Sequence, residues 1–300
     1  MSDQSVLFQH VTFAYEGATE PLLVDLSVHF ARGWTGIVGA NGVGKSTILK
    51  LATGLLKPRE GFVAAPSSAV YCEQRTDSVP ASFEEFVAAR GRGAAAIRDR
   101  LGIQRDWIER WNTLSHGERK RAQIAVAIWM KPDILALDEP TNHLDQEAKK
   151  MLHDSLSRFD GVGLLVSHDR KLLDDLCFQC LFVDPPESIL RPGNYSDGSL
   201  QANRDRFAAL RMWNEARHEF ARLKQEASRR RAEAAGADRK RSKKGLARKD
   251  HDTRARINLA RVSGKDGAAG KKLRQIEGRL TQAQARVESI TVRKDQTLGI

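Results

Sequence analysis

Phosphate-binding chemistry is indicated most strongly by the segment Trp34–Lys50, WTGIVGANGVGKSTILK. A short apolar run, Thr35–Val38, leads into a glycine-rich loop and then into helical sequence, which is the strand–loop–helix order that a phosphate-cradling loop requires. Glycine allows backbone angles that a Cβ forbids, so successive N–H groups can turn toward phosphate oxygens, and the following helix directs its N-terminal dipole at the same anion. Lys45 supplies positive charge for the β- and γ-phosphates, and Ser46 offers a hydroxyl to Mg²⁺. The residues expected around the phosphates are Gly39, Asn41, Gly42, Gly44, Lys45, Ser46 and Thr47.

Two further apolar runs end in residues that can do metal and acid–base chemistry. Ile134–Leu137 has the composition of a fully buried parallel strand and ends in the adjacent carboxylates Asp138 and Glu139. Such a pair suits a Mg²⁺–phosphate site, in which the first carboxylate serves the ion and the second serves a water molecule. Val162–Val166 predicts another buried strand, and His168 follows it at the same edge of the sheet, where it can contact a γ-phosphate. A lone histidine is more often structural. Because the glycine-rich loop and the Asp138–Glu139 pair also follow strands, the functional interpretation of His168 is favoured.

A second anion site is predicted at Leu114–Glu118, LSHGE, which opens an amphipathic helix that runs to about Met130. Ser115 and Gly117 lie where the first turn of that helix presents free N–H groups. Tyr15, upstream of the phosphate loop, can stack on a nucleotide base through its ring. Position alone favours that role and an ordinary strand aromatic equally.

The remaining pattern indicates an α/β domain followed by a helical hairpin. Two apolar seams with steps of three and four residues predict two long helices that zip together antiparallel, the first over Leu200–Ala235 and ~50 Å long. A turn cluster, Pro192–Gly198, is expected to close the α/β part. The strand candidates are Val6–Tyr15 with Leu26–Phe30 as its partner, Gly61–Ala65, Ala69–Glu73, and a last hairpin of Cys177–Asp184 with Ser188–Leu190. The seams are Ala209, Trp213, Ala216, Phe220, Leu223 and Ala227 in the first helix, and Leu273, Ile276, Leu280, Ala283, Val287 and Ile290 in the second.

Charge is distributed very unevenly between these two parts. The chain carries a formal net charge of +11, with a small negative excess before residue 201 and a large positive excess after it. The positive charge is densest between the seams, in Gly236–Gly270, which we expect to be partly disordered when free. A basic hairpin tip of this kind favours contact with nucleic acid; an anionic membrane surface or a solvated face without a partner are the weaker interpretations.

Other features exclude several classes of protein. Cys177 and Cys180 have C-x-x-C spacing, but no second pair or histidine cluster completes a zinc site, so both are expected to be small buried residues. The N-terminus has neither the basic segment nor the apolar core of a signal peptide. No apolar run approaches the ~20 residues that span a bilayer. We therefore expect a soluble, cytoplasmic protein without membrane insertion.

Taken together, these stretches resemble an ATP-binding cassette (ABC) ATPase. GANGVGKST is similar to its Walker A loop, ILALDE to its Walker B strand and LSHGE to its signature; Gln74 matches the Q-loop, Leu144–Gln146 the D-loop and Ser167–Asp169 the switch-histidine loop, all in the family's order. EPTNHLD is typical of the ABC-F proteins, which act on ribosomes, and GNYSDG followed by a basic helical hairpin resembles their interdomain linker. The implied fold is a P-loop NTPase of the ABC type, with a mixed sheet, an antiparallel β subdomain and a helical signature subdomain, followed by an α-helical hairpin.

The resemblance also implies roles for individual residues. Tyr15 would stack on the adenine of ATP, and Lys45 would hold the phosphates. Glu139 would be the general base for the attacking water, and His168 would contact the γ-phosphate and orient that water. Mg²⁺ would be held by Ser46, Gln74 and Asp138. An opposing nucleotide would meet the signature residues Ser115 and Gly117, and Asp145 of the D-loop would also bind nucleotide.

The implied organisation is a cassette at 1–197, a basic linker at 198–292 with its tip at about 236–270, and the start of a second cassette at 293–300. The linker would reach ribosomal RNA and transfer RNA. Because ATP is sandwiched between two cassettes in this family, we predict poor hydrolysis by a monomer, and a second cassette supplied in trans or by a longer parent chain. His116 replaces the usual glycine of the signature, which makes signature function less certain than Walker function.

Three other classes of protein remain as alternatives. The nucleotide-binding subunit of a transporter would explain the cassette but not the basic hairpin or EPTNHLD. A chromosome or repair ATPase would carry its coiled coil inside the cassette, whereas here the coil follows it. A non-hydrolysing, ATP-gated binding module is disfavoured by intact Glu139 and His168. Whether the role is housekeeping translation or protection from a ribosome-targeting antibiotic stays open.

Overall fold

The computed structural model describes residues 5–241 and 265–290 of the 300-residue chain. These residues form two compact units, one ending at Gln201 and the other beginning at Ala202. Across the part of the chain that is described, no helix is both long enough and apolar enough to cross a membrane.

The first unit begins with a small antiparallel sheet. It contains β1 (Val6–Phe13), β2 (Leu23–Phe30) and β4 (Glu60–Ala64), in the order β2-β1-β4. The predicted pairing of the first two strands is confirmed, with β1 and β2 antiparallel. Alternate side chains of β1 are buried, as expected of a sheet that packs on one face only.

A six-stranded mixed sheet carries the residues that the sequence predicts to bind phosphate and Mg²⁺. Its strands are parallel except for the final antiparallel pair, and β6 and β7 are buried along their whole length, as their apolar runs predict. The central neighbours β6, β7 and β3 are the strands that precede the paired carboxylates, the histidine and the glycine-rich loop, so these groups emerge at one edge of the sheet. The strand order is β5 (Ala69–Cys72), β6 (Ile134–Asp138), β7 (Val162–Val166), β3 (Gly33–Val38), β8 (Cys177–Asp184) and β9 (Glu187–Pro192).

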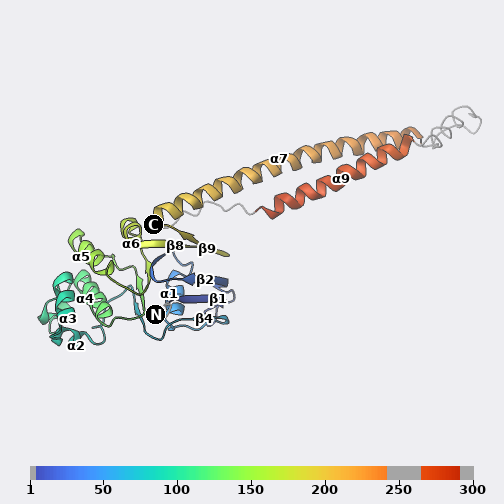
Figure 1. Ribbon diagram of the computed structural model, residues 1–300. Helices are drawn as coiled ribbons and strands as arrows, with labels where there is room; N and C mark the ends of the chain where they lie inside the picture. Colours follow the sequence, from blue (N-terminus) through green and yellow to red (C-terminus); the bar gives the residue numbers. More distant parts are fainter. Residues whose placement is uncertain (1–4, 242–264, 291–300) are drawn as a thin grey trace, which may run out of the picture. The chain divides into compact units, whose positions relative to one another are not determined.

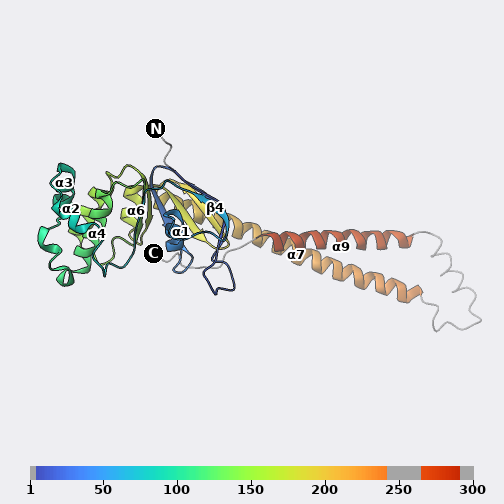
Figure 2. The same cartoon turned by 90° about the horizontal axis from the view of Figure 1, so that it is seen from below.

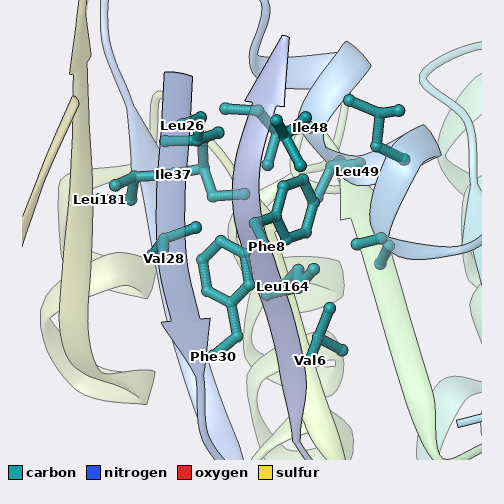
Figure 3. Packing of buried hydrophobic residues seen from close by; sticks show 14 of the residues in the cluster. Val6, Phe8, Leu26, Val28, Phe30, Ile37, Ile48, Leu49, Leu164 and Leu181 are labelled. Carbon is teal, nitrogen blue, oxygen red and sulfur yellow. The ribbon is translucent and has the colours of Figure 1, made fainter. Parts of the chain in front are cut away.

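The main core lies between the two sheets and around α1 (Lys45–Ala52). Figure 3 shows Phe8 and Phe30 from the small sheet beside Ile37 and Leu164 from the large one, with Ile48 of α1 next to them. The Phe8 and Phe30 rings meet edge to face, with 5.6 Å between centroids. This packing fixes the helix that follows the glycine-rich loop against the strand that precedes it.

Helices complete the first unit. Figure 1 shows α2 (Phe83–Ala88), α3 (Arg92–Leu101) and α4 (His116–Trp129) gathered together in this unit, away from the small antiparallel sheet. They share their own apolar cluster, which includes Trp107 and Trp111. On the other face of the large sheet, α4, α5 (Gln146–Leu156) and α6 (Arg170–Leu176) contribute to a third cluster. The helix predicted to open at LSHGE is α4, which confirms that part of the sequence interpretation.

The second unit contains α7 (Tyr195–Arg241) from Ala202 onward and the antiparallel helix α9 (Lys265–Ser289). Figure 2 shows them running alongside one another. Five of the twelve predicted seam residues are buried, namely Ala216, Leu223 and Ala227 of α7 and Ile276 and Ala283 of α9, and the other seven are half-buried. Ion pairs join the helices on the outside, Arg231 with Glu277 and Arg286 with Glu219.

The start of the first long helix differs from the prediction. The expected turn cluster Pro192–Gly198 ends at Asn194, and α7 begins at Tyr195 instead of Leu200. The reason is local capping, because the Asn194 side chain accepts a bond of 2.9 Å from the Asp197 N–H. At 47 residues, α7 is ~70 Å long, against the ~50 Å expected. The hairpin tip lies mainly at 242–264, outside the described residues, as does the segment 291–300; the backbone is helical at 236–241 and 265–270.

Candidate nucleotide-binding site

The glycine-rich loop begins after β3 ends at Val38, turns at Asn41 and Gly42, and enters α1 at Lys45. A Cβ added at Gly39 would lie 2.3 Å from the carbonyl oxygen of Val183, so only glycine fits where the loop passes β8. Gly44, the residue before α1, has φ 103°, a conformation that side chains disfavour. At Gly39 the close contact is with β8. The opposite, concave side of the loop, toward which backbone N–H groups can point, is therefore left for an anion.

Lys45 lies inside the curve of this loop. Its Nζ donates to the carbonyl oxygens of Gly39, at 2.7 Å, and Ala40, at 3.1 Å. Burial lowers the pKa of Lys45, and the charges of Glu139 and Asp138 partly oppose that effect. The ammonium group therefore lies close enough to both carboxylates to interact with them and within the loop that is predicted to hold phosphates.

A cleft of about 450 Å³ collects most of the predicted site residues. Four predicted residues do not line it: Gly39, Ser115, Gly117 and Asp145. The resemblance assigns the signature residues Ser115 and Gly117 to an opposing nucleotide. Gly39 contributes through its carbonyl contact with Lys45. The residues that line the cleft are Tyr15, Leu22, Asn41, Gly42, Gly44, Lys45, Ser46, Thr47, Gln74, Asp138, Glu139, Asn142, Val166 and His168.

Asp138 closes β6 and is almost fully buried. Its Oδ2 accepts a hydrogen bond of 2.9 Å from the hydroxyl of Tyr71, on the neighbouring strand β5. Burial and the charge of Asp138 raise the pKa of Tyr71, so the hydroxyl remains a donor at any working pH. The bond leaves Oδ1 available and fixes the orientation of the carboxylate.

Glu139 is held against His168 at the next position. One carboxylate oxygen accepts from the His168 backbone N–H at 3.1 Å, and the other lies 3.1 Å from Nε2 of the same histidine. Glu139 has φ 50°, an uncommon angle for a residue with a side chain, which is a form of strain found at functional sites. Burial raises the pKa of Glu139, against the lowering effect of His168. A buried carboxylate with a raised pKa, fixed by two contacts, has the properties of a general base.

Tyr15 lies at the rim of the cleft and is 47% exposed. Its hydroxyl hydrogen-bonds to Oγ1 of Thr47 at 2.9 Å, and its ring packs edge to face on Phe13. The contact with Thr47 ties the aromatic ring to the first turn of α1. An exposed ring so placed beside the phosphate loop can stack on a base.

A second cleft of about 450 Å³ begins where the first ends. Its lining includes Gln74 and Asn142, which also line the first cleft, together with His116, Lys120 and His143. The His116 and His143 rings lie 5.6 Å apart. The substituted signature residue therefore faces the EPTNHLD segment.

The signature and D-loop residues also act as helix caps. Ser115 and Glu118 form a reciprocal capping box at the start of α4. Asp145 caps α5 by accepting a bond of 2.8 Å from the Ala148 N–H. Gly117 faces Leu144 and the His143 carbonyl at distances that leave little room for a side chain.

Sequence reasoning missed four residues of the site: Leu22, Tyr71, Asn142 and Val166. Tyr71 gave no signal of its own, and its contact with Asp138 depends on the strand order. Asn142 lies inside the quoted EPTNHLD motif without having been assigned a role. Leu22 and Val166 are apolar and carry no local signal of a binding site. The expected burial of Cys177 and Cys180 is confirmed, and neither forms a disulfide. No cluster of three or more possible metal ligands occurs within 5–241 or 265–290.

The donor set fits Mg²⁺ and a nucleoside triphosphate. Ser46, Asp138 and Gln74 offer a hydroxyl, a carboxylate and an amide oxygen, which are the hard oxygen ligands that Mg²⁺ prefers. The glycines of the loop add no side chains to the space beside it, so phosphate can approach the backbone. The fold and this cleft define a P-loop nucleotide-binding domain.

Comparison with known proteins narrows that class. Residues 23–142 match the family model for "ABC transporter". The chain is 31% identical over 253 residues to the energy-dependent translational throttle protein EttA of Escherichia coli (strain K12), covering 68% of this chain and 44% of that protein. It is 33% identical over 168 residues to the ribosome protection protein VmlR of Bacillus subtilis (strain 168), covering 54% and 28%. It is 31% identical over 203 residues to a putative ABC transporter ATP-binding protein of Nitratidesulfovibrio vulgaris, covering 58% and 74%.

The chain therefore belongs to the ATP-binding cassette family, in the ABC-F branch that includes EttA and VmlR. It spans less than half the length of these two relatives.

Proposed function

We propose that this protein binds and hydrolyses ATP with Mg²⁺ and acts on the ribosome in the cytoplasm. The observation that carries the enzymatic part is the pairing of Glu139 with His168 at the strand ends opposite Lys45. In this proposal Lys45 and the loop N–H groups bind the phosphates, and Tyr15 stacks on adenine. Ser46, Gln74 and Asp138 hold Mg²⁺, which neutralises phosphate charge.

Hydrolysis follows from what these side chains can do. Glu139 accepts a proton from the attacking water, while Nε2 of His168 orients the γ-phosphate and the water in line with the bond that breaks. Positioning and charge neutralisation supply most of the rate in such a transfer. Because Ser115, Gly117 and Asp145 do not line the nucleotide cleft, we assign them to the nucleotide of a second cassette, in trans or in a longer parent chain.

Two observations support the ribosome as the target. The names of EttA and VmlR concern translation and ribosome protection. The second unit belongs to the strongly basic end of the chain, and exposed arginines such as Arg204, Arg211 and Arg222 lie on α7. A basic surface of this kind binds the phosphate backbone of RNA, so we assign ribosomal RNA and transfer RNA to the linker.

The test is ribosome co-sedimentation of Glu139→Gln, with and without ATP. The amide preserves the shape of the side chain but cannot accept the proton, so turnover should fall by about 10²–10⁴-fold while ATP binding persists. We expect the variant to pellet with ribosomes only when ATP is present. Glu147→Gln, an exposed residue of α5, is the matched control and should behave as wild type.

A second variant tests the hairpin. Residues 242–264 are replaced by a short Gly-Ser linker, which should abolish pelleting without changing ATP binding. If Glu139→Gln does not pellet either alone or with an added second cassette, the ribosome proposal is wrong. Co-purification of the wild-type chain with a membrane protein would then favour a transporter subunit, as the description of the matching family model allows.

A further inference from the structure

Gln74 lies where the two clefts meet. It lines both of them and follows the end of β5 by two residues. Cys72, the last residue of that strand, is fully enclosed, whereas Glu73 and Gln74 are exposed. The position of the Gln74 amide therefore depends on what holds the chain at Glu73.

Lys120 of α4 holds the chain at that point. Only 3% of this lysine is exposed, and its Nζ donates to the backbone carbonyl of Glu73 at 2.5 Å and to Oε1 of Gln123 at 3.0 Å. Neither of these two acceptors is a carboxylate. Placing an ammonium group in such a site costs free energy, since it gives up water for two neutral acceptors. Burial lowers the pKa of Lys120 accordingly, in part balanced by Cys72, Asp138 and Glu73.

The same contact joins two parts of the first unit. Lys120 lies one turn into α4, the helix that the Ser115 cap and His116 begin. Glu73 directly follows β5, the edge strand of the six-stranded sheet, which pairs with β6, the strand that ends in Asp138. A shift of α4 therefore moves the donor that fixes the backbone immediately before Gln74.

We propose that Lys120 is a positioning residue for Gln74, fixing that side chain toward a Mg²⁺-bound nucleoside triphosphate. The inference rests on the proposed function, because it takes Gln74 to be a ligand in the Mg²⁺ site. The hydrogen bond from Lys120 to the Glu73 carbonyl oxygen therefore connects the start of α4 to the backbone next to Gln74. A contact that merely stabilised the fold would not distinguish Mg²⁺-bound from Mg²⁺-free nucleotide.

The experiment is a double-mutant cycle between Lys120→Met and Gln74→Ala in the full chain. Affinity for a fluorescent ATP analogue is measured with Mg²⁺ and with EDTA, and thermal unfolding is recorded for each variant. Lys120→Met should weaken binding about fivefold to tenfold with Mg²⁺, leave it unchanged in EDTA, and cause no further loss when Gln74 is already alanine. Lys120→Arg keeps a donor and should recover most of the affinity.

Gln123→Met is the matched control, because it removes the other acceptor of Lys120 and leaves the Glu73 carbonyl bonded. It should bind Mg²⁺ with nucleotide as wild type does. If Lys120→Met does not fold, Lys120→Gln takes its place in the cycle.

The outcomes separate the two proposals. If wild type does not bind Mg²⁺ with the analogue, the proposed function fails and the inference fails with it. If wild type binds, but Lys120→Met binds equally well or weakens Gln74→Ala by the same factor, only the inference is overturned.

Discussion

The hydroxyl of Tyr71 offers a single-atom test of the metal side of the site. Tyr71→Phe removes the donor 2.9 Å from Oδ2 of Asp138 and keeps the ring in place between its neighbours. Partners that orient a metal ligand from behind change metal affinity by about 10–100-fold when they are removed. Tyr71 is half-buried, so we expect the low end of that range, about tenfold or ~1.4 kcal/mol.

The assay is a Mg²⁺ titration of nucleotide binding by the 300-residue chain. Affinity without Mg²⁺ should not change, because the Tyr71 hydroxyl contacts the carboxylate and not the phosphate loop. The raised pKa of Tyr71 keeps the donor protonated, so the difference between wild type and variant should be the same from about pH 6 to pH 9. Tyr195→Phe, whose ring stacks on Phe182 away from the cleft, is the control. Superimposable Mg²⁺ titrations of Tyr71→Phe and wild type would refute the reasoning.

Two further predictions concern stability. Gly163→Ala places a Cβ 2.4 Å from the Trp34 ring and should destabilise the protein by about 1–3 kcal/mol in urea unfolding. Gly278→Ala in α9, where no other described atom lies within 4 Å of the added Cβ, should stabilise its helix by about 0.8–1 kcal/mol; equal effects at the two sites would contradict both expectations. Asp169 caps α6 and bonds to Lys149 at 2.8 Å; burial raises its pKa, but these bonds outweigh burial and lower it. Wild type should therefore be more stable than Asp169→Asn above the unfolded pKa of about 3.9, by less than ~1 kcal/mol, and this advantage should disappear as pH falls through the folded pKa; a difference independent of pH would exclude the ionic contribution.

Local signals predicted much of this molecule. The apolar runs before Asp138 and His168 are continuous and short, which is typical of strands buried on both faces, so their location could be predicted without a structure. The succession of glycine-rich loop and helix likewise depends on adjacent residues. The helical seam was also predictable, because its period appears within a single stretch of chain.

What the sequence did not predict depends on contacts between distant segments. Tyr71 and Asp138 are 67 positions apart, and Lys120 and Glu73 are 47 apart. Each contact follows from strand order and helix packing, which no local pattern encodes. The predicted start of α7 was wrong for another reason. Asn194 and Gly198 are typical of turns, but Asn194 caps the helix and Gly198 lies within its first turn.

The short helix α6 lies between the histidine loop and the first turn of α7. Asp169 forms its N-terminal cap, directly after His168. Near its other end, Asp174 accepts hydrogen bonds from the N–H and hydroxyl of Ser196, at 2.7 and 2.6 Å, in the first turn of α7. A helix of seven residues is ~10 Å long and cannot bend appreciably over that length. Under the proposed function, the γ-phosphate contact of His168 and the first turn of α7 are therefore separated by one short helix, with Asp169 at one end and Asp174 near the other.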